Sequence, residues 1–236
     1  MLRLVLVLIF MGMPAAGQSI SVDLGTDGSI TSTTLQLFAL ITVLSLAPGI
    51  AIMVTCFPFF LTVFSILRQA IGLQQAPPNM LIVSLALFLT YYVMEPVFWS
   101  AYQDGVEPFL AGATELDAAW RQISEPFKTF MMSRVDQEVL IRMQNLRAQP
   151  ATVDPNLGVL IPSFMLSEIA RAFEIGFLIF LPFLIIDLVV AAVLMSMGMM
   201  MVPPAVVSLP FKLAFFVVSD GWVLLAEALV RGYTGV

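Results

Sequence analysis

Methionine is the residue whose type and spacing are most unusual in this sequence. Five methionines fall within seven residues, directly before a Pro-Pro pair: Met195, Met197, Met199, Met200 and Met201, then Pro203 and Pro204. Thioether sulfur suits Cu(I), and the flexible side chain conforms to varied apolar surfaces. The run is therefore compatible with a soft metal site, a flexible apolar constriction, or ordinary apolar residues of a membrane helix.

Other catalytic chemistry is poorly supported. The chain has no histidine, the commonest general base and metal ligand, and only one cysteine, Cys56. It has no phosphate-binding loop, nucleophile elbow or zinc-protease motif. A copper site lacks a histidine or cysteine partner near the methionines, and adjacent methionines point in different directions on a helix. We therefore expect no enzyme activity, no cofactor and no metal.

Six charged residues in or beside apolar segments are candidates for assembly or gating: Glu168, Arg171, Glu174, Asp187, Lys212 and Asp220. The first three have i, i+3 spacing, so Arg171 can pair with either carboxylate. Asp187 stands alone in an apolar run, where an acid is by default a functional candidate such as a proton relay. An ion pair, for example with Lys212, is the favoured alternative because no series of acids marks a continuous path.

Composition indicates a membrane protein. Of 236 residues, 60% are hydrophobic and 11% are charged, and the mean hydropathy is +0.99. One soluble core of this size cannot bury so much apolar surface. The net charge of −6 argues against nucleic acid as a partner, because there is no basic patch to neutralise phosphates. We therefore expect membrane lipid to surround the apolar segments of this chain.

The N-terminus has the pattern of a cleaved signal peptide. Arg3 precedes a short apolar run, and small residues follow it, which predicts a signal peptide over residues 1–17. Residues 18–36 are rich in Ser, Thr, Gly and Asp and are expected to be flexible.

Four apolar segments follow, each long enough to span a bilayer with tilt: 37–67, 80–102, 176–198 and 206–229. They predict an all-α membrane protein with a first helical hairpin over 37–102, a soluble helical insert over 103–161 and a second hairpin over 162–236. Internal prolines, among them Pro58, Pro182 and Pro210, predict kinks.

A short repeat supports two hairpins with similar tips. The pattern Gly-x-x-x-x-Pro-Pro occurs twice, first with Gly72, Pro77 and Pro78 and then with Gly198, Pro203 and Pro204. Glycine can end a helix by adopting φ > 0, and Pro-Pro favours an extended turn before the next helix. The methionines would then lie at the second tip.

The insert between the hairpins is more polar. Residues 103–175 hold ten acidic and six basic residues, a net of 6 − 10 = −4. Helical spacing covers 115–123 and 127–147, with Ser124 as the expected N-cap of the second helix and Pro126 in its first turn. After a cleaved signal, counting spans places this insert on the extracytoplasmic side.

Several motifs together resemble the FliP/SctR family, the export-gate subunits of bacterial type III secretion. They are LPFLIIDLV at 181–189, the run from Met195 to Pro204, LPFKL at 209–213 and DGW at 220–222, with further matches at 68–72, 76–79, 126–131, 161–164 and 167–177. Nearly the whole mature chain takes part in this resemblance.

The resemblance implies a function. Family members form a ring of five copies that joins a small two-helix subunit and a larger single-copy subunit, and unfolded proteins leave the cytoplasm through it. Met199, Met200 and Met201 would form the pore constriction. The inner membrane at the flagellar basal body is the implied location, and an injectisome subunit or an ion-coupled secondary transporter is the alternative. Many members carry a basic residue where Phe59 stands, so an ion pair at that position is not expected here.

Overall fold

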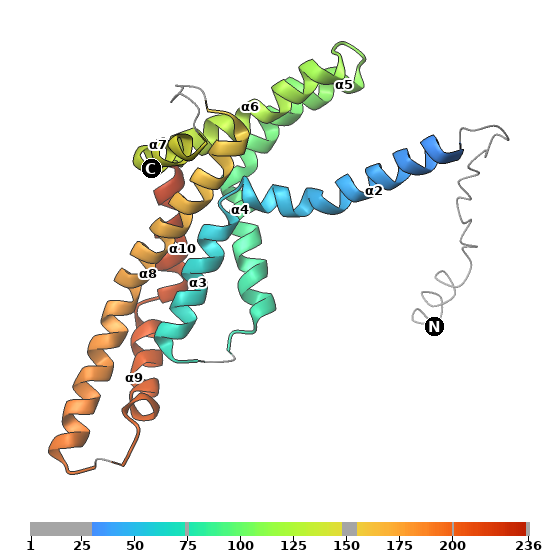
Figure 1. The fold of residues 1–236 in the computed structure, drawn as a ribbon. Helices are drawn as coiled ribbons and strands as arrows, with labels where there is room; N and C mark the ends of the chain where they lie inside the picture. The colour runs from blue at the N-terminus through green and yellow to red at the C-terminus, as the bar shows by residue number, and fades with distance from the viewer. Residues whose placement is uncertain (1–29, 74–75, 148–154, 200, 235–236) are drawn as a thin grey trace, which may run out of the picture. The chain divides into compact units, whose positions relative to one another are not determined.

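The computed structural model describes residues 30–73, 76–147, 155–199 and 201–234 (Figure 1). The predicted signal peptide, most of the segment 18–36 and Met200 lie outside these residues. By its internal contacts the chain divides into residues 1–46 and residues 47–236, and each unit is described by itself. All elements among the described residues are helices apart from turns and connecting segments, as the sequence predicted.

Helix α2, Ile30–Met53, runs through Pro48 and Gly49 without a break. It begins before the expected start of the first apolar segment at residue 37. From Phe38 to Met53 every side chain is exposed. A helix that is apolar on all sides requires lipid or other protein around it.

The first hairpin consists of α3, Phe57–Ile71, and α4, Asn79–Ala101. The helical conformation is interrupted at Val54–Cys56. Pro58 therefore lies in the first turn of α3 and not, as was expected, inside a kinked helix. This position suits proline because its missing N–H would have no helical partner there. A π-helical turn, η1 Tyr102–Val106, and the short α5, Glu107–Leu110, extend α4.

The insert contains α6, Leu116–Arg134, and α7, Gln137–Leu146. The expected helix start at Ser124 is wrong, because α6 passes through Ser124 and Pro126. The Ser124 hydroxyl donates to the carbonyl of Arg121 within the helix. The cap is instead Asp136, whose carboxylate accepts from the N–H groups of Glu138 and Val139 at the start of α7.

The second hairpin consists of α8, Leu157–Ser196, followed by α9, Pro204–Val218, and α10, Gly221–Thr234. Asn156 caps α8, which is continuous through Pro162 and Pro182 and so joins the insert directly to the hairpin. Helices α9 and α10 are bent by 60° at Ser219–Asp220. Figure 1 shows α9 and α10 returning along α8, with α3 beside them.

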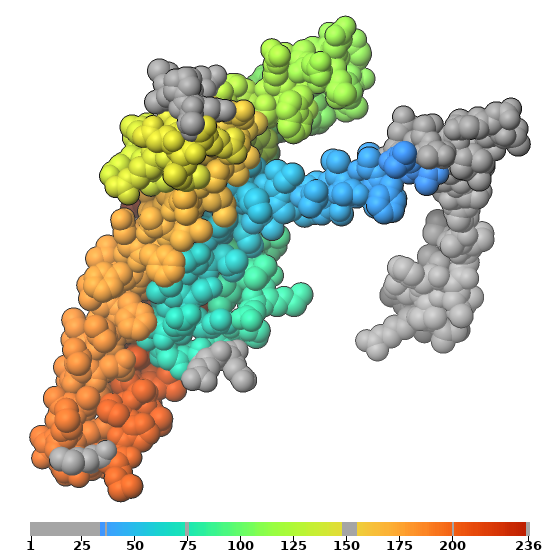
Figure 2. Space-filling model, viewed as in Figure 1, coloured from blue at the N-terminus to red at the C-terminus, as the bar shows by residue number. Residues whose placement is uncertain are grey.

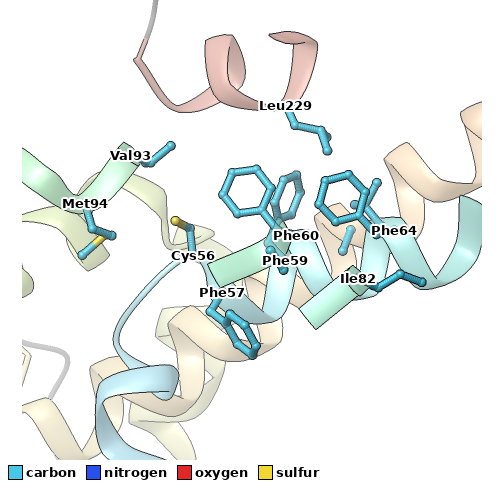
Figure 3. Close-up of a cluster of buried hydrophobic side chains, with 12 residues drawn as sticks. Cys56, Phe57, Phe59, Phe60, Phe64, Ile82, Val93, Met94 and Leu229 are labelled. Atoms are coloured by element: carbon cyan, nitrogen blue, oxygen red, sulfur yellow. The ribbon is translucent and has the colours of Figure 1, made fainter. Parts of the chain in front are cut away.

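The core is an aromatic cluster built around α3 (Figure 3). Phe60 and Phe64 are fully buried, and Leu229 of α10 covers them. Phe59 is 2% exposed, and its ring lies edge-on to Tyr233 with 5.3 Å between centroids. Phe59 therefore makes an apolar contact in this chain.

Two helices are long and apolar enough to cross a membrane: Asn79–Leu110, which combines α4, η1 and α5, and Leu157–Ser196, which is α8. The number rises to four if each of two bent pairs, α2 with α3 and α9 with α10, counts as one span. These observations on the described residues confirm the class of all-α membrane protein with bent helices.

Close packing of α8 on α3 depends on Gly176. A Cβ atom there would clash with Cδ1 of Ile66 and lie 3.0 Å from its Cγ2. We expect Gly176→Ala to lower the free energy of unfolding in detergent by about 1–3 kcal/mol, because overpacking forces the helices apart. Ile66→Val removes the clashing Cδ1 and should recover part of this loss. Gly232→Ala is the control, since a Cβ atom at Gly232 would have no other atom within 4 Å; equal losses in both alanine variants would contradict the packing explanation.

Candidate functional site

The second tip is a tightly defined turn. Gly198 has φ 74° and its N–H donates to the carbonyl of Met195 at 3.1 Å, while the N–H of Met199 donates to Leu194 at 3.0 Å. These two bonds form a Schellman motif, which requires a left-handed residue and therefore favours glycine. Pro203 is extended, and Pro204 is the first residue of α9. Glycine and the proline pair thus occupy the backbone conformations that the repeat predicts for a turn.

The first tip also has a glycine with positive φ and a proline pair. Gly72 ends α3 with φ 91°, and Pro78 is extended before α4 begins at Asn79. The peptide bond before Pro77 is cis. Arg68, in the last turn of α3, donates to the side chain of Asn79 across the tip. The second tip has no charged residue in its sequence. The two tips share a left-handed glycine after the first helix, but the next helix begins after the proline pair at the first tip and at its second proline at the second tip.

The described methionines of the second tip are exposed. The exposed fraction is 98% for Met201, 68% for Met197, 60% for Met195 and 42% for Met199. Such exposure of a cluster of large apolar side chains indicates a contact surface. Met200, the fifth predicted member of the cluster, lies outside the described residues.

An apolar hollow of about 600 Å³ lies between α8 and α9 behind this tip. Met197 and Met199 line it together with Val193, Leu194 and Phe211. The methionines therefore have unfilled apolar space beside them as well as open space in front. A flexible thioether side chain can move between the two without a polar cost.

An ion pair holds the two helices of this hairpin together. The Lys212 ammonium on α9 lies 2.6 Å from Oδ2 of Asp187 on α8, and it donates to the carbonyl of Ala70 on α3 at 3.1 Å. The hydroxyl of Ser208 donates to the other carboxylate oxygen at 2.6 Å. Lys212 is 5% exposed, so its charge is neutralised and solvated by these groups and not by water.

The expected pairing of Asp187 with Lys212 is thus present, and it is intramolecular. One ammonium joins α8, α9 and the end of α3 close to the first tip. The pair lies on the hairpin before the methionine turn, so it fixes the separation of α8 and α9 from which the tip projects.

A second charged cluster joins the insert to the hairpin. Glu168 on α8 is fully buried, with Arg171 Nη1 at 2.9 Å and Arg134 Nε at 3.6 Å from the same oxygen. The Tyr233 hydroxyl donates to the other oxygen of Glu168. Arg134 also lies 4.1 Å from the centre of the Tyr233 ring and donates to the carbonyl of Gly232 at 2.8 Å. The end of α6, the middle of α8 and the end of α10 therefore meet at one carboxylate.

Two of the six predicted charges take no part in these clusters. Glu174 is exposed on α8, and no described residue forms an ion pair with it, so Arg171 pairs with Glu168 alone of the two possible carboxylates. Asp220 is exposed at the bend between α9 and α10 with φ 49°, and its carbonyl accepts from the N–H groups of Val223 and Leu224. Aspartate tolerates this left-handed conformation better than most residues.

Three residues of these clusters were missed by the sequence analysis: Ser208, Arg134 and Tyr233. Each is distant in sequence from its acidic partner, so helical spacing gave no signal for the contact. The presence of buried acids was itself a signal, because a buried carboxylate requires several donors.

Comparison with known proteins gives the family. The model of the FliP family matches residues 40–229, which include both tips and all six predicted charges. The chain belongs to the FliP family. A "flagellar biosynthetic protein FliP" of Caulobacter vibrioides is 51% identical over 227 residues, covering 94% of this chain and 85% of that protein. Proteins with the same name from Rhizobium meliloti and Bacillus subtilis are 49% and 42% identical and cover 93% and 91% of this chain. The chain covers 93% and 98% of those two relatives.

In this FliP-family chain, the contribution of the Asp187–Lys212 ion pair to stability can be tested by removing its cation. Lys212→Met leaves Asp187 in the helix interface without its cation, and we expect a loss of about 3 kcal/mol in the free energy of unfolding. The double variant Asp187→Asn with Lys212→Met should lose less than the sum of the two single variants, because it leaves no unpaired charge. Denaturation of the purified protein in detergent measures both.

Arg231→Met is the matched control, since Arg231 pairs with Glu227 at 2.6 Å where both side chains are more than half exposed. An exposed pair contributes under about 1 kcal/mol. Additive losses in the Asp187 and Lys212 cycle, or equal losses for Lys212→Met and Arg231→Met, would contradict the role given to the buried pair.

Proposed function

We propose that this chain is an inner-membrane subunit of the flagellar protein export apparatus, and that several copies surround a protein-conducting pore. The names of its relatives support the flagellar system, since each is called a flagellar biosynthetic protein. The second tip supplies the constriction of the pore through Met199, Met201 and the neighbouring methionines. On this proposal the protein acts as a structural subunit and not as an enzyme.

The observation that carries the proposal is the exposure of the methionines at the turn that Gly198 begins. One copy cannot close a ring, and it leaves Met197 and Met201 more than two-thirds exposed. Five copies, as the family resemblance implies, would bring these thioethers together around one axis. The tip then gains in the assembly the apolar contacts that it lacks in the single chain.

Methionine suits such a seal for two reasons. An apolar constriction blocks ions by excluding water from the pore. The unbranched side chains repack at low cost, so they can close against one another at rest and adapt to passing chains of varied sequence. The hollow beside Met197 and Met199 offers space into which side chains move when a substrate passes.

Exposed apolar faces elsewhere support assembly with further subunits and with lipid. Phe88 on α4 is 73% exposed, and Phe177 and Leu178 on α8 are more than 60% exposed. We propose that neighbouring copies, a small two-helix subunit and a larger single-copy subunit cover these faces. The insert 103–161 would lie on the extracytoplasmic side after removal of the signal peptide.

An ion-coupled transporter is less well supported by the charges of the second hairpin. Asp187 would be the acid that carries the ion, but both of its carboxylate oxygens are engaged, by Lys212 and Ser208. This arrangement suits a fixed structural joint better than a relay that must take up and release protons.

The seal can be tested by shortening its side chains. We expect Met199→Ala with Met201→Ala to make the resting membrane leak K⁺ in cells that carry the complete export apparatus, because the constriction becomes wider and wetter. Replacement of both by Leu keeps the apolar volume and should keep the seal. Potassium efflux from washed cells measures the leak.

Met80→Ala is the control, because Met80 is 80% exposed beside the first tip. It should leave efflux unchanged. A tight membrane in the double alanine variant, with normal amounts of assembled complex, would disprove the methionine constriction.

A further inference from the structure

The end of the insert farthest from the second tip forms a separate projection. It consists of α5, the turn over residues 111–115 and the first turns of α6, and residues 107–121 are called the arm here. In Figures 1 and 2 the arm, in light green, stands clear of α7, α8 and α10. No contact with the ion-pair clusters or the methionine tip, among the described residues, explains its surface.

Large apolar side chains cover the arm. The exposed fraction is 73% for Leu110, 69% for Leu116, 64% for Trp120 and 41% for Phe109. Leu116 and Trp120 have i, i+4 spacing and so lie on one face of α6. All four side chains fall within residues 109–120 around one turn, and together they are called the patch here.

These side chains are not needed to hold the arm together. The close approach of Gly105 to Ile123 and the contact of the Phe98 and Phe127 rings, 5.8 Å between centroids, pack α6 against η1 and α4. Ala119, next to Trp120, is buried in this packing at 1% exposure. The exposed patch is therefore additional to the fold.

Acidic residues are close to the patch in the sequence. Glu107, Glu115 and Asp117 are exposed, and Arg121 is the one basic residue in the sequence of the arm, giving a net charge of 1 − 3 = −2. No described residue forms an ion pair with any of the three carboxylates. An apolar centre with a polar rim is the usual anatomy of a protein interface.

We propose that the arm is a docking surface for a basic segment of another protein, in which apolar side chains lie next to Lys or Arg. The apolar side chains would cover Leu116 and Trp120, and the basic ones would pair with Glu115 and Asp117. This inference concerns the insert alone and does not depend on the methionine seal.

The charges select this occupant over two others. An anionic lipid surface would be repelled by three carboxylates, although Trp and Leu are otherwise typical of membrane interfaces. A second copy of this chain is a poor complement, because the chain has a net charge of −6 and its own arm has the same net charge of −2, so like charges would face each other. A basic partner satisfies both the apolar centre and the rim.

A partner docked at the arm would also be connected to the second hairpin through α6. Helix α6 runs unbroken from the arm to Arg134, which contacts Glu168 on α8 and Tyr233 on α10. A partner bound at the arm thus holds the part of the chain to which the hairpin is joined.

Photo-crosslinking in cells tests the docking surface. A photoreactive residue in place of Trp120, in the full-length chain, should capture one segment that mass spectrometry identifies by its Lys or Arg residues beside apolar ones. Glu115→Gln with Asp117→Asn should lower the yield about fivefold or more, because the rim pairs are lost. Asp117→Lys should abolish capture, and a Lys or Arg to Glu change in the captured segment should restore it.

Matched controls accompany the experiment. The same photoreactive residue at Ala118, on the opposite side of α6, should capture nothing at this segment. Glu174→Gln neutralises an exposed acid on α8 and should leave the yield unchanged. Trp120→Ala should also leave thermal unfolding unchanged, which shows that the arm stays folded. Capture of lipid, of a second copy or of nothing, or a yield that does not respond to the rim charges, would overturn the proposal.

Discussion

The contact of the Lys212 ammonium with Asp187 is the interaction on which the arrangement of this protein depends. It places one positive charge where α8, α9 and the end of α3 meet, in surroundings that are otherwise apolar. A buried charge has few acceptable positions, because only its partner charge and hydrogen bonds replace the water that it has lost. The pair therefore sets the register between the hairpins as well as contributing attraction. The tips project from helices whose relative positions this one contact restricts.

A second buried carboxylate has a similar effect in the first half of α8. Glu168 collects Arg134, Arg171 and Tyr233 from three helices, so the insert and the C-terminal helix are joined to α8 at a single point. Between the two clusters, packing depends on shape. Gly176 allows α8 to approach α3 closely, and the α3 aromatic rings fill the space under α10. The two ion-pair clusters, which restrict the positions of the helices, and the flexible methionine side chains thus occupy different parts of the same hairpin.

Local sequence patterns predicted the local features well. In both Gly-x-x-x-x-Pro-Pro segments the glycine has positive φ after one helix and the proline pair lies at the start of the next, because a free φ and the lack of a proline N–H are properties of the residues themselves. Predictions that depended on competition between elements were less successful. Ser124 did not start a helix, because its position in the middle of α6 is supported by packing against η1 and α4 on one side. Pro58 lies in the first turn of a helix and does not bend one, because the helical conformation is interrupted just before α3.

The sequence by itself determined that this is an apolar, all-helical chain with two hairpins, and that its methionines lie at a turn. Those properties follow from composition and from spacing over a few residues. The pairing of Asp187 with Lys212 was one of the alternatives that the sequence offered. Only the tertiary structure decided that this pair forms within one chain, that Ser208 and the carbonyl of Ala70 complete it, and that Glu168 meets Tyr233. Helices bring together residues that are 25 and 65 positions apart here, and no local pattern records which faces will meet. The physical reason is that a buried charge requires partners from several elements, and only the folded chain supplies them at once.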